Sequence, residues 1–210
     1  LGLWLGSMNI SSELLDIEKE QLPWVIPLFI LTMVLVLMIH ELGHVVTGLA
    51  QGFRFELFVT GFLGIRREDK GRIRLFFNMD PNLFGGAAAT SPPDHHKDNH
   101  RKFARTVIAG PLVSLLLALV LIPLAFLLPQ PAQFLVFIGG FFSFMIFLAT
   151  TLPSRSGIFY TDRKRYQRLL SKGRDSQTEM ALLKALSLQS AGKSLKTMTP
   201  EELEAISGDA

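Results

Sequence analysis

Long apolar runs separated by charged stretches dominate the pattern of this chain. Residues 22–39 carry no charge, and neither do residues 106–154. A helix that crosses a bilayer needs about 20 apolar residues, so the second run is too long for a single span. Pro129-Gln130-Pro131 divides it into a hairpin of two helices. The pattern predicts membrane helices near 23–50, 106–128 and 133–153.

The connection after the first apolar run alternates between apolar and polar residues. Phe53–Leu57 alternates, and Arg72–Phe76 alternates again after a charged turn at Glu68–Gly71. A period of two predicts short β-strands, so we expect a β-element over about 53–78, with its apolar side near the membrane helices. Gly85–Ala89 consists of small residues and is predicted to be a loop or packing segment.

The chain becomes polar and helical in character after residue 172. Ser176–Glu179 and Thr199–Glu202 each have the spacing of a helix-capping box, and Gly192 between them is expected to end the first helix. We expect residues 173–210 to form a short cytoplasmic helical appendage that continues beyond Ala210. The fold class is therefore an α-helical polytopic membrane protein with a three-helix membrane core at 22–172 and an N-terminal flank at 1–21. Because the chain starts at Leu1 rather than Met, an earlier span ending there is left open.

The positive charges lie beside the apolar runs rather than forming one patch. Basic residues gather in the 51–105 connection and after residue 154, whereas the hairpin at 129–133 has none. The positive-inside rule then puts the 51–105 connection and the C-terminus in the cytoplasm, in a multi-pass protein of the cell membrane. A net charge of +3 distributed in this way argues against nucleic-acid binding. The bilayer is the expected partner, in agreement with 49% hydrophobic residues.

The first apolar run ends in the pentapeptide His40-Glu41-Leu42-Gly43-His44. Two histidines four residues apart on a helix lie on one face, with Cβ atoms about 5–6 Å apart, so both rings reach one zinc ion. A glutamate beside the first histidine can act on the water at such an ion. Ionisable groups at membrane depth are costly and therefore favour a functional role. The chain has no cysteine, so a zinc site must use histidine and carboxylate.

A catalytic zinc ion takes three protein ligands and keeps one position open. The residues alone leave several candidates for the third ligand. Asp162 follows the third predicted membrane helix on the same side as the pentapeptide, although Arg163 and Arg165 beside it also fit an exposed loop. The other candidates belong to the 51–105 connection, and they are Asp80, Asp94, His95, His96 and His100.

The chain resembles the site-2 protease family of intramembrane zinc metallopeptidases over most of residues 24–175. The pentapeptide, Ala109-Gly110-Pro111 opening the second helix, and Leu152-Pro153 leading to Asp162 carry the resemblance. It implies a three-helix core, a membrane-associated β-element, His40, His44 and Asp162 as zinc ligands, and Glu41 as catalytic base. The family commonly has Asn where this chain has Thr151 and Ser114, and Gly where it has Arg163. These departures concern groups that orient the substrate.

The expected activity is that of a zinc metalloendopeptidase that cuts a peptide bond in or near the transmembrane helix of a protein substrate. An edge strand from the 53–76 region is expected to pair with the unwound substrate. Two alternatives remain: a zinc hydrolase of membrane-borne esters, and an inactive member that binds transmembrane helices as a scaffold. The intact Glu41 argues against the scaffold, and Thr151 and Arg163 argue mildly for it.

Overall fold

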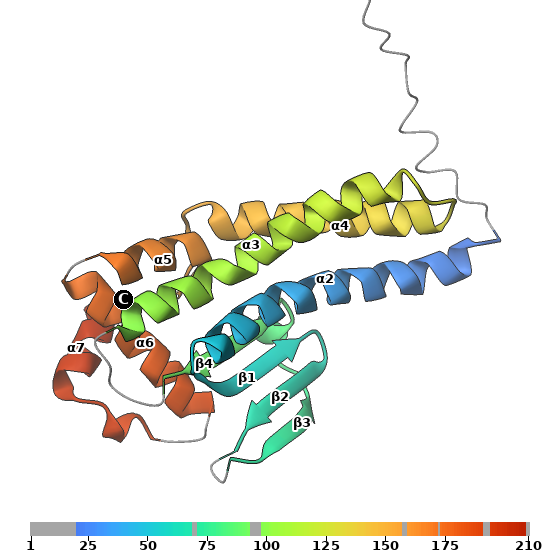
Figure 1. The fold of residues 1–210 in the computed structure, drawn as a ribbon. Coiled ribbons are helices and arrows are strands. Elements are labelled where there is room, and N and C mark those ends of the chain that lie inside the picture. Colours follow the sequence, from blue (N-terminus) through green and yellow to red (C-terminus); the bar gives the residue numbers. More distant parts are fainter. Residues whose placement is uncertain are drawn as a thin grey trace, which may run out of the picture.

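Three long helices lie side by side in the computed structural model (Figure 1), which describes residues 20–68, 71–92, 98–156, 159–171, 173–190 and 194–208. They are α2 (Leu22–Ala50), α3 (Asn99–Ala125) and α4 (Ala132–Thr151), and each is long and apolar enough to cross a membrane. The prediction of three apolar helices is confirmed. The C-terminal end of α2, the start of α3 and the end of α4 meet at one end of the bundle.

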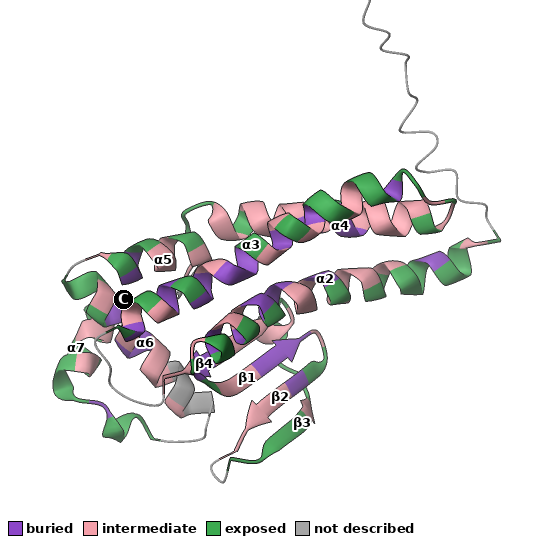
Figure 2. Ribbon diagram, viewed as in Figure 1, coloured by how far each residue is buried: buried purple, intermediate pink, exposed green. Residues whose placement is uncertain are grey.

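The outward faces of these helices are apolar. Trp24, Val46 and Leu119 are each more than half exposed, at 76%, 60% and 64%. Exposed positions recur along the lengths of α2 and α3 (Figure 2). Monomeric soluble proteins rarely expose apolar surface on this scale. The faces therefore fit an integral membrane protein.

Helix α3 begins at Asn99, before the apolar run that was predicted to start it near residue 106. Its charged first turns stay helical because Phe103, Ala104 and Val107 pack into a buried cluster with Phe53 and Leu169. The Gly110-Pro111 pair consequently lies inside α3, and the expectation that it opens the helix is wrong.

An antiparallel sheet of four strands packs beside α2 in the order β3-β2-β1-β4. The strands are β1 (Arg54–Thr60), β2 (Leu63–Arg67), β3 (Ile73–Phe77) and β4 (Ala87–Ser91). The predicted β-element is present, but Gly85–Ala89 does not stay a loop, since β4 begins within it. Val59 pairs with Ala87 and Phe55 with Thr90. Alanine has little intrinsic strand preference, so β1 supplies the pairing that the local sequence does not indicate.

Two short strands, β5 (Arg155–Ser156) and β6 (Phe159–Tyr160), form a narrow ladder after α4. Three helices follow: α5 (Asp162–Leu170), α6 (Arg174–Ser190) and α7 (Pro200–Ser207). Single 3-10 turns lie at Pro81–Leu83 and Leu195–Thr197. Helix α5 was not predicted. It packs on α3 through Leu169, and Met180 and Leu183 of α6 join the same buried cluster.

The two predicted capping boxes have different outcomes. At α7, Glu202 N–H donates to the Thr199 hydroxyl and Thr199 N–H donates to the Glu202 carboxylate, so this box is confirmed. The Ser176–Glu179 box is wrong because α6 already begins at Arg174. Ser176 instead donates to the Leu169 carbonyl at 3.2 Å, and Glu179 pairs with arginines of α5. The predicted stop at Gly192 lies outside the described residues.

Candidate metal centre

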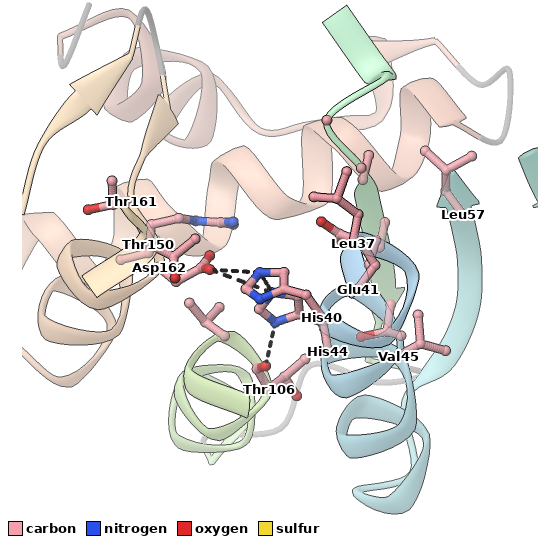
Figure 3. A pocket seen from close by; sticks show the side chains of 18 of the residues that line it. Leu37, His40, Glu41, His44, Val45, Leu57, Thr106, Thr150, Thr161 and Asp162 are labelled. Atoms are coloured by element: carbon pink, nitrogen blue, oxygen red, sulfur yellow. Dashed lines mark hydrogen bonds and ion pairs between the residues drawn. The ribbon is translucent and has the colours of Figure 1, made fainter. Parts of the chain in front are cut away.

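His40 and His44 lie one helical turn apart near the C-terminal end of α2, and both rings are largely buried. Their Nε2 atoms are 3.4 Å apart. Each Nε2 lies 3.6 Å from Asp162 Oδ2. Figure 3 shows the two rings and the carboxylate converging from α2 and α5. The structure therefore brings Asp162 to His40 and His44, which precede it in the sequence by more than a hundred residues.

The spacing of these three donor atoms fits a small tetrahedral ion. Zinc binds nitrogen and oxygen at about 2.0–2.1 Å, and a tetrahedron with such bonds has edges of about 3.3–3.4 Å. The observed edges are 3.4, 3.6 and 3.6 Å. Among the described histidines and carboxylates, this is the group in which three ligand atoms lie within 4.8 Å of one another. The donor set suits zinc, since two imidazoles and one carboxylate leave a fourth position open.

Each histidine is oriented through its second ring nitrogen. His44 Nδ1 lies 2.9 Å from the Thr106 carbonyl, which can only accept, so Nδ1 carries a proton and Nε2 is the nitrogen that faces Asp162. His40 Nδ1 lies 2.8 Å from the buried Ser114 hydroxyl. The Ser143 hydroxyl of α4 in turn donates to the Ser114 carbonyl at 2.8 Å. All three membrane-length helices therefore contribute to the placement of the rings.

The face of α3 toward the histidines is a stripe of small residues at Thr106, Gly110 and Ser114. A Cβ atom at Gly110 would lie 2.2 Å from His44 Nε2, so any side chain there would displace the ring. In the sequence Ser114 stood out only as a departure from the family pattern, and its contact with His40 was not predicted. Gly110 and Ser114 follow Thr106 by four and eight residues, which places all three on one helix face. This spacing is a signal in the sequence from which the stripe could have been found.

Asp162 occupies the first turn of α5, and the chain before it is tied back to α4. The Thr161 hydroxyl donates to the Leu152 carbonyl at 2.9 Å and accepts from Ser154 N–H at 3.2 Å. Burial by itself would raise the pKa of Asp162, but hydrogen bonds from His40 and His44 and the charges of His44 and Arg165 hold that pKa below its usual range. The carboxylate is therefore ionised, as a metal ligand must be.

The other candidates for the third ligand lie elsewhere. Asp80 lines the adjoining cavity, and His100 lies in the first turn of α3; neither belongs to the three-residue group. Asp94, His95 and His96 lie outside the described residues. Arg163 is exposed, and Arg165 pairs with Glu179 rather than with Asp162. The reading of Asp162 as an exposed loop residue paired with neighbouring arginines is therefore not what the structure has.

A cavity of about 780 Å³ opens beside the three donors and is lined by α2, β4, α3, α4 and α5. Glu41 is buried at its wall, 8% exposed. Gly86, with a φ of +96°, brings the start of β4 so near that a Cβ there would lie 2.6 Å from Glu41 Oε1. Thr150 lines the cavity, whereas Thr151 donates back to the Phe147 carbonyl at 2.5 Å. The arrangement places a carboxylate, a metal-ligand set and an edge strand around one space.

Comparison with known proteins agrees with this geometry. The family model described as peptidase family M50 matches residues 28–207, which is most of the chain. No curated protein and no solved structure gives a match. The matched region contains most of α2, all of α3 and α4, the sheet and every residue of the candidate metal centre. The chain therefore belongs to peptidase family M50, the site-2 protease family of metallopeptidases.

Proposed function

We propose that this protein is a zinc endopeptidase that cuts membrane proteins in or near a transmembrane segment. The observation that carries the proposal is the triangle of His40, His44 and Asp162 donors, which opens on a cavity that Glu41 also lines. It lies where three membrane-length helices meet a sheet edge.

The ligands in this proposal are His40 Nε2, His44 Nε2 and an Asp162 oxygen. Zinc bound there would supply Lewis-acid chemistry, polarising the scissile carbonyl and acidifying water. Glu41 takes a proton from the attacking water as the water oxygen bonds to the carbonyl carbon, and the carbonyl π electrons move to the carbonyl oxygen. Glu41 then gives the proton to the amide nitrogen as the C–N bond breaks, which leaves a carboxyl end and an amine end.

The edge strand best placed to hold the substrate is β4. The sheet has two edges, β3 and β4, and β4 lines the cavity through residues 87–90. We expected the pairing strand to come from residues 53–76, and we now propose β4, which lies outside that region. An extended peptide added to β4 would satisfy its own backbone groups after it leaves a helix. This suits a substrate whose transmembrane helix unwinds locally.

In this proposal, the distribution of basic residues and the three apolar helices together give the orientation of the protein in the membrane. The 51–105 and post-154 segments carry the basic residues, and the positive-inside rule assigns both to the cytoplasm, with the candidate site near that face of the cell membrane. Single cysteines at Ser91 and Gln130 in this cysteine-free chain should react with an impermeant reagent from opposite sides. Reaction from one side only would contradict the three-span topology.

The deciding experiment measures zinc content and cleavage of a tagged single-span membrane protein by the purified chain. We expect about one zinc per chain and cleavage in or near the span. Zinc without peptide cleavage, but with hydrolysis of a membrane-borne ester, would move the protein to the esterase alternative. Binding of the single-span protein without any hydrolysis would move it to the scaffold alternative.

A further inference from the structure

Arg165 brings a positive charge to the wall of the candidate active-site cavity. It lies three residues after Asp162 on α5, so the two side chains are neighbours on one helix face. Its side chain is 19% exposed and lines the cavity together with His40, His44 and Glu41. Among the described residues that line the cavity, Arg165 is the one whose side chain is permanently protonated.

The buried carboxylate of Glu179, on α6, binds the Arg165 side chain. Arg165 Nε donates to Glu179 Oε2 at 3.4 Å, and Glu179, on α6, is only 1% exposed. Arg168 Nε lies 2.9 Å from the other oxygen of Glu179, and its guanidinium lies 4.5 Å above the Tyr160 ring. Two guanidinium groups of α5 thus face one deeply buried carboxylate of α6. The contact with Glu179 therefore holds the direction of the Arg165 side chain.

The terminal nitrogens of Arg165 are available to a ligand. In the part of the chain that the structure describes, its hydrogen bond to Glu179 uses Nε, and Nη1 and Nη2 make none. Several other donors on the cavity wall are already used: the hydroxyls of Thr106, Thr150 and Thr161 donate to backbone carbonyls. Arg165 thus offers planar paired donors, whereas these three hydroxyls already donate to the backbone.

We propose that Arg165 is a catalytic residue that donates from its terminal nitrogens to the oxyanion formed at the scissile carbonyl, and that Glu179 is the residue that positions it. The inference rests on the proposed peptidase function. In the attack described above, the carbonyl oxygen gains an electron pair, and a fixed cation beside it stabilises that charge more than it stabilises the neutral carbonyl. Arg165 exchanges no proton and forms no covalent bond.

The first test compares Arg165→Gln and Arg165→Lys in the purified, zinc-loaded full chain. Removing one donor to an oxyanion typically lowers kcat by about 10²–10³-fold, and we expect a loss of this size for Arg165→Gln. KM should change less than threefold, and zinc content should stay at the parent value, because the lost contact exists only in the transition state. Arg165→Lys keeps the charge without the paired donors, so its kcat should lie between that of the parent and that of Arg165→Gln.

The second test measures binding and does not depend on turnover. A peptide phosphinate carries a tetrahedral anion in place of the scissile amide, whereas the peptide of the same sequence is neutral there. Arg165→Gln should weaken phosphinate binding at least about tenfold more than peptide binding, because the charge-assisted hydrogen bonds go to the anion. If the parent protein binds the phosphinate but cuts no peptide, the proposed function is refuted. The comparison of phosphinate and peptide binding would still test the role of Arg165.

The role of Glu179 is tested by a double-mutant cycle. Glu179→Gln should lower kcat less than Arg165→Gln does, and Arg165→Gln/Glu179→Gln should be no slower than Arg165→Gln alone, since Glu179 acts through Arg165. The matched control is Lys184→Gln, which removes the 2.8 Å ion pair between Lys184 of α6 and Glu202 of α7. This control should keep kcat within about twofold of the parent, because the pair does not line the cavity.

Three results would overturn the inference. A folded Arg165→Gln protein with kcat within threefold of the parent removes the catalytic role. If Arg165→Gln loses zinc in proportion to its loss of activity, the role of Arg165 is to hold the ligand Asp162 in place instead. Independent, multiplicative effects of Arg165→Gln and Glu179→Gln would remove the positioning role of Glu179. If Arg165→Gln does not fold, the Arg165→Lys variant decides through the same phosphinate-to-peptide comparison.

Discussion

The two sides of the candidate metal centre are built differently. His40 and His44 come from a single helix, where a spacing of four residues fixes their separation. Asp162 comes from the start of α5, held by the Thr161 contacts and by the packing of α5 on α3. The separation of the two histidines, on what we call the helical side, is therefore set by local geometry within α2. The position of Asp162 is set by contacts between distant segments. Substitutions should accordingly act in different ways on the two sides.

The largest effect is expected on the helical side. His44→Ala removes a ligand and should lower zinc affinity by on the order of 10³-fold or more, since loss of an outer partner alone costs about 10–100-fold. Cleavage should fall below detection. Zinc content after dialysis and the cleavage assay measure both effects. His100→Ala is the matched control and should behave as the parent, because His100 lies outside the three-donor group.

The corresponding change on the other side is Asp162→Asn. The amide oxygen is a weaker ligand than a carboxylate, so we expect zinc affinity to fall by about 10²-fold and cleavage to be lost. Titration with zinc under a competing chelator measures the loss. A triple His95/His96/His100→Ala variant should keep about one zinc per chain. The opposite pattern would move the third ligand into the 51–105 connection.

Glu41→Gln separates chemistry from metal binding within the helical side. It removes the base but no ligand, so zinc content should remain at the parent value while kcat falls by about 10²–10⁴-fold. The measurement is cleavage by protein of known zinc content. Activity within tenfold of the parent would show that another group takes the proton.

The smallest effect is expected at the outer partner of His40. Ser114→Ala removes the hydroxyl 2.8 Å from His40 Nδ1 and should weaken zinc binding by about 10–100-fold. Ser114→Thr keeps the hydroxyl and serves as the control. If Ser114→Ala binds zinc like the parent, the orientation of His40 is already fixed by α2, and the helical side is even more independent than we propose.

The sequence predicted those features whose signals are local. The apolar runs identified the three long helices, and the alternating residues identified β1 and β3. Features that depend on contacts with distant parts of the chain were not predicted. Strand β4 consists largely of alanines and forms because β1 pairs with it. Glu179 sits in a capping-box pattern, yet two arginines of α5 bind its carboxylate.

What the sequence by itself determined is the pair of histidines and Glu41 on one helix, because helical periodicity converts spacing directly into geometry. The residues also pointed to Asp162 as one candidate among several, and the family resemblance selected it. Tertiary structure alone brought Asp162 to 3.6 Å from both rings and put Ser114 against His40. It also turned Arg165 onto the cavity wall. These placements come from helix packing and chain pairing across long separations, which no local pattern of residues encodes.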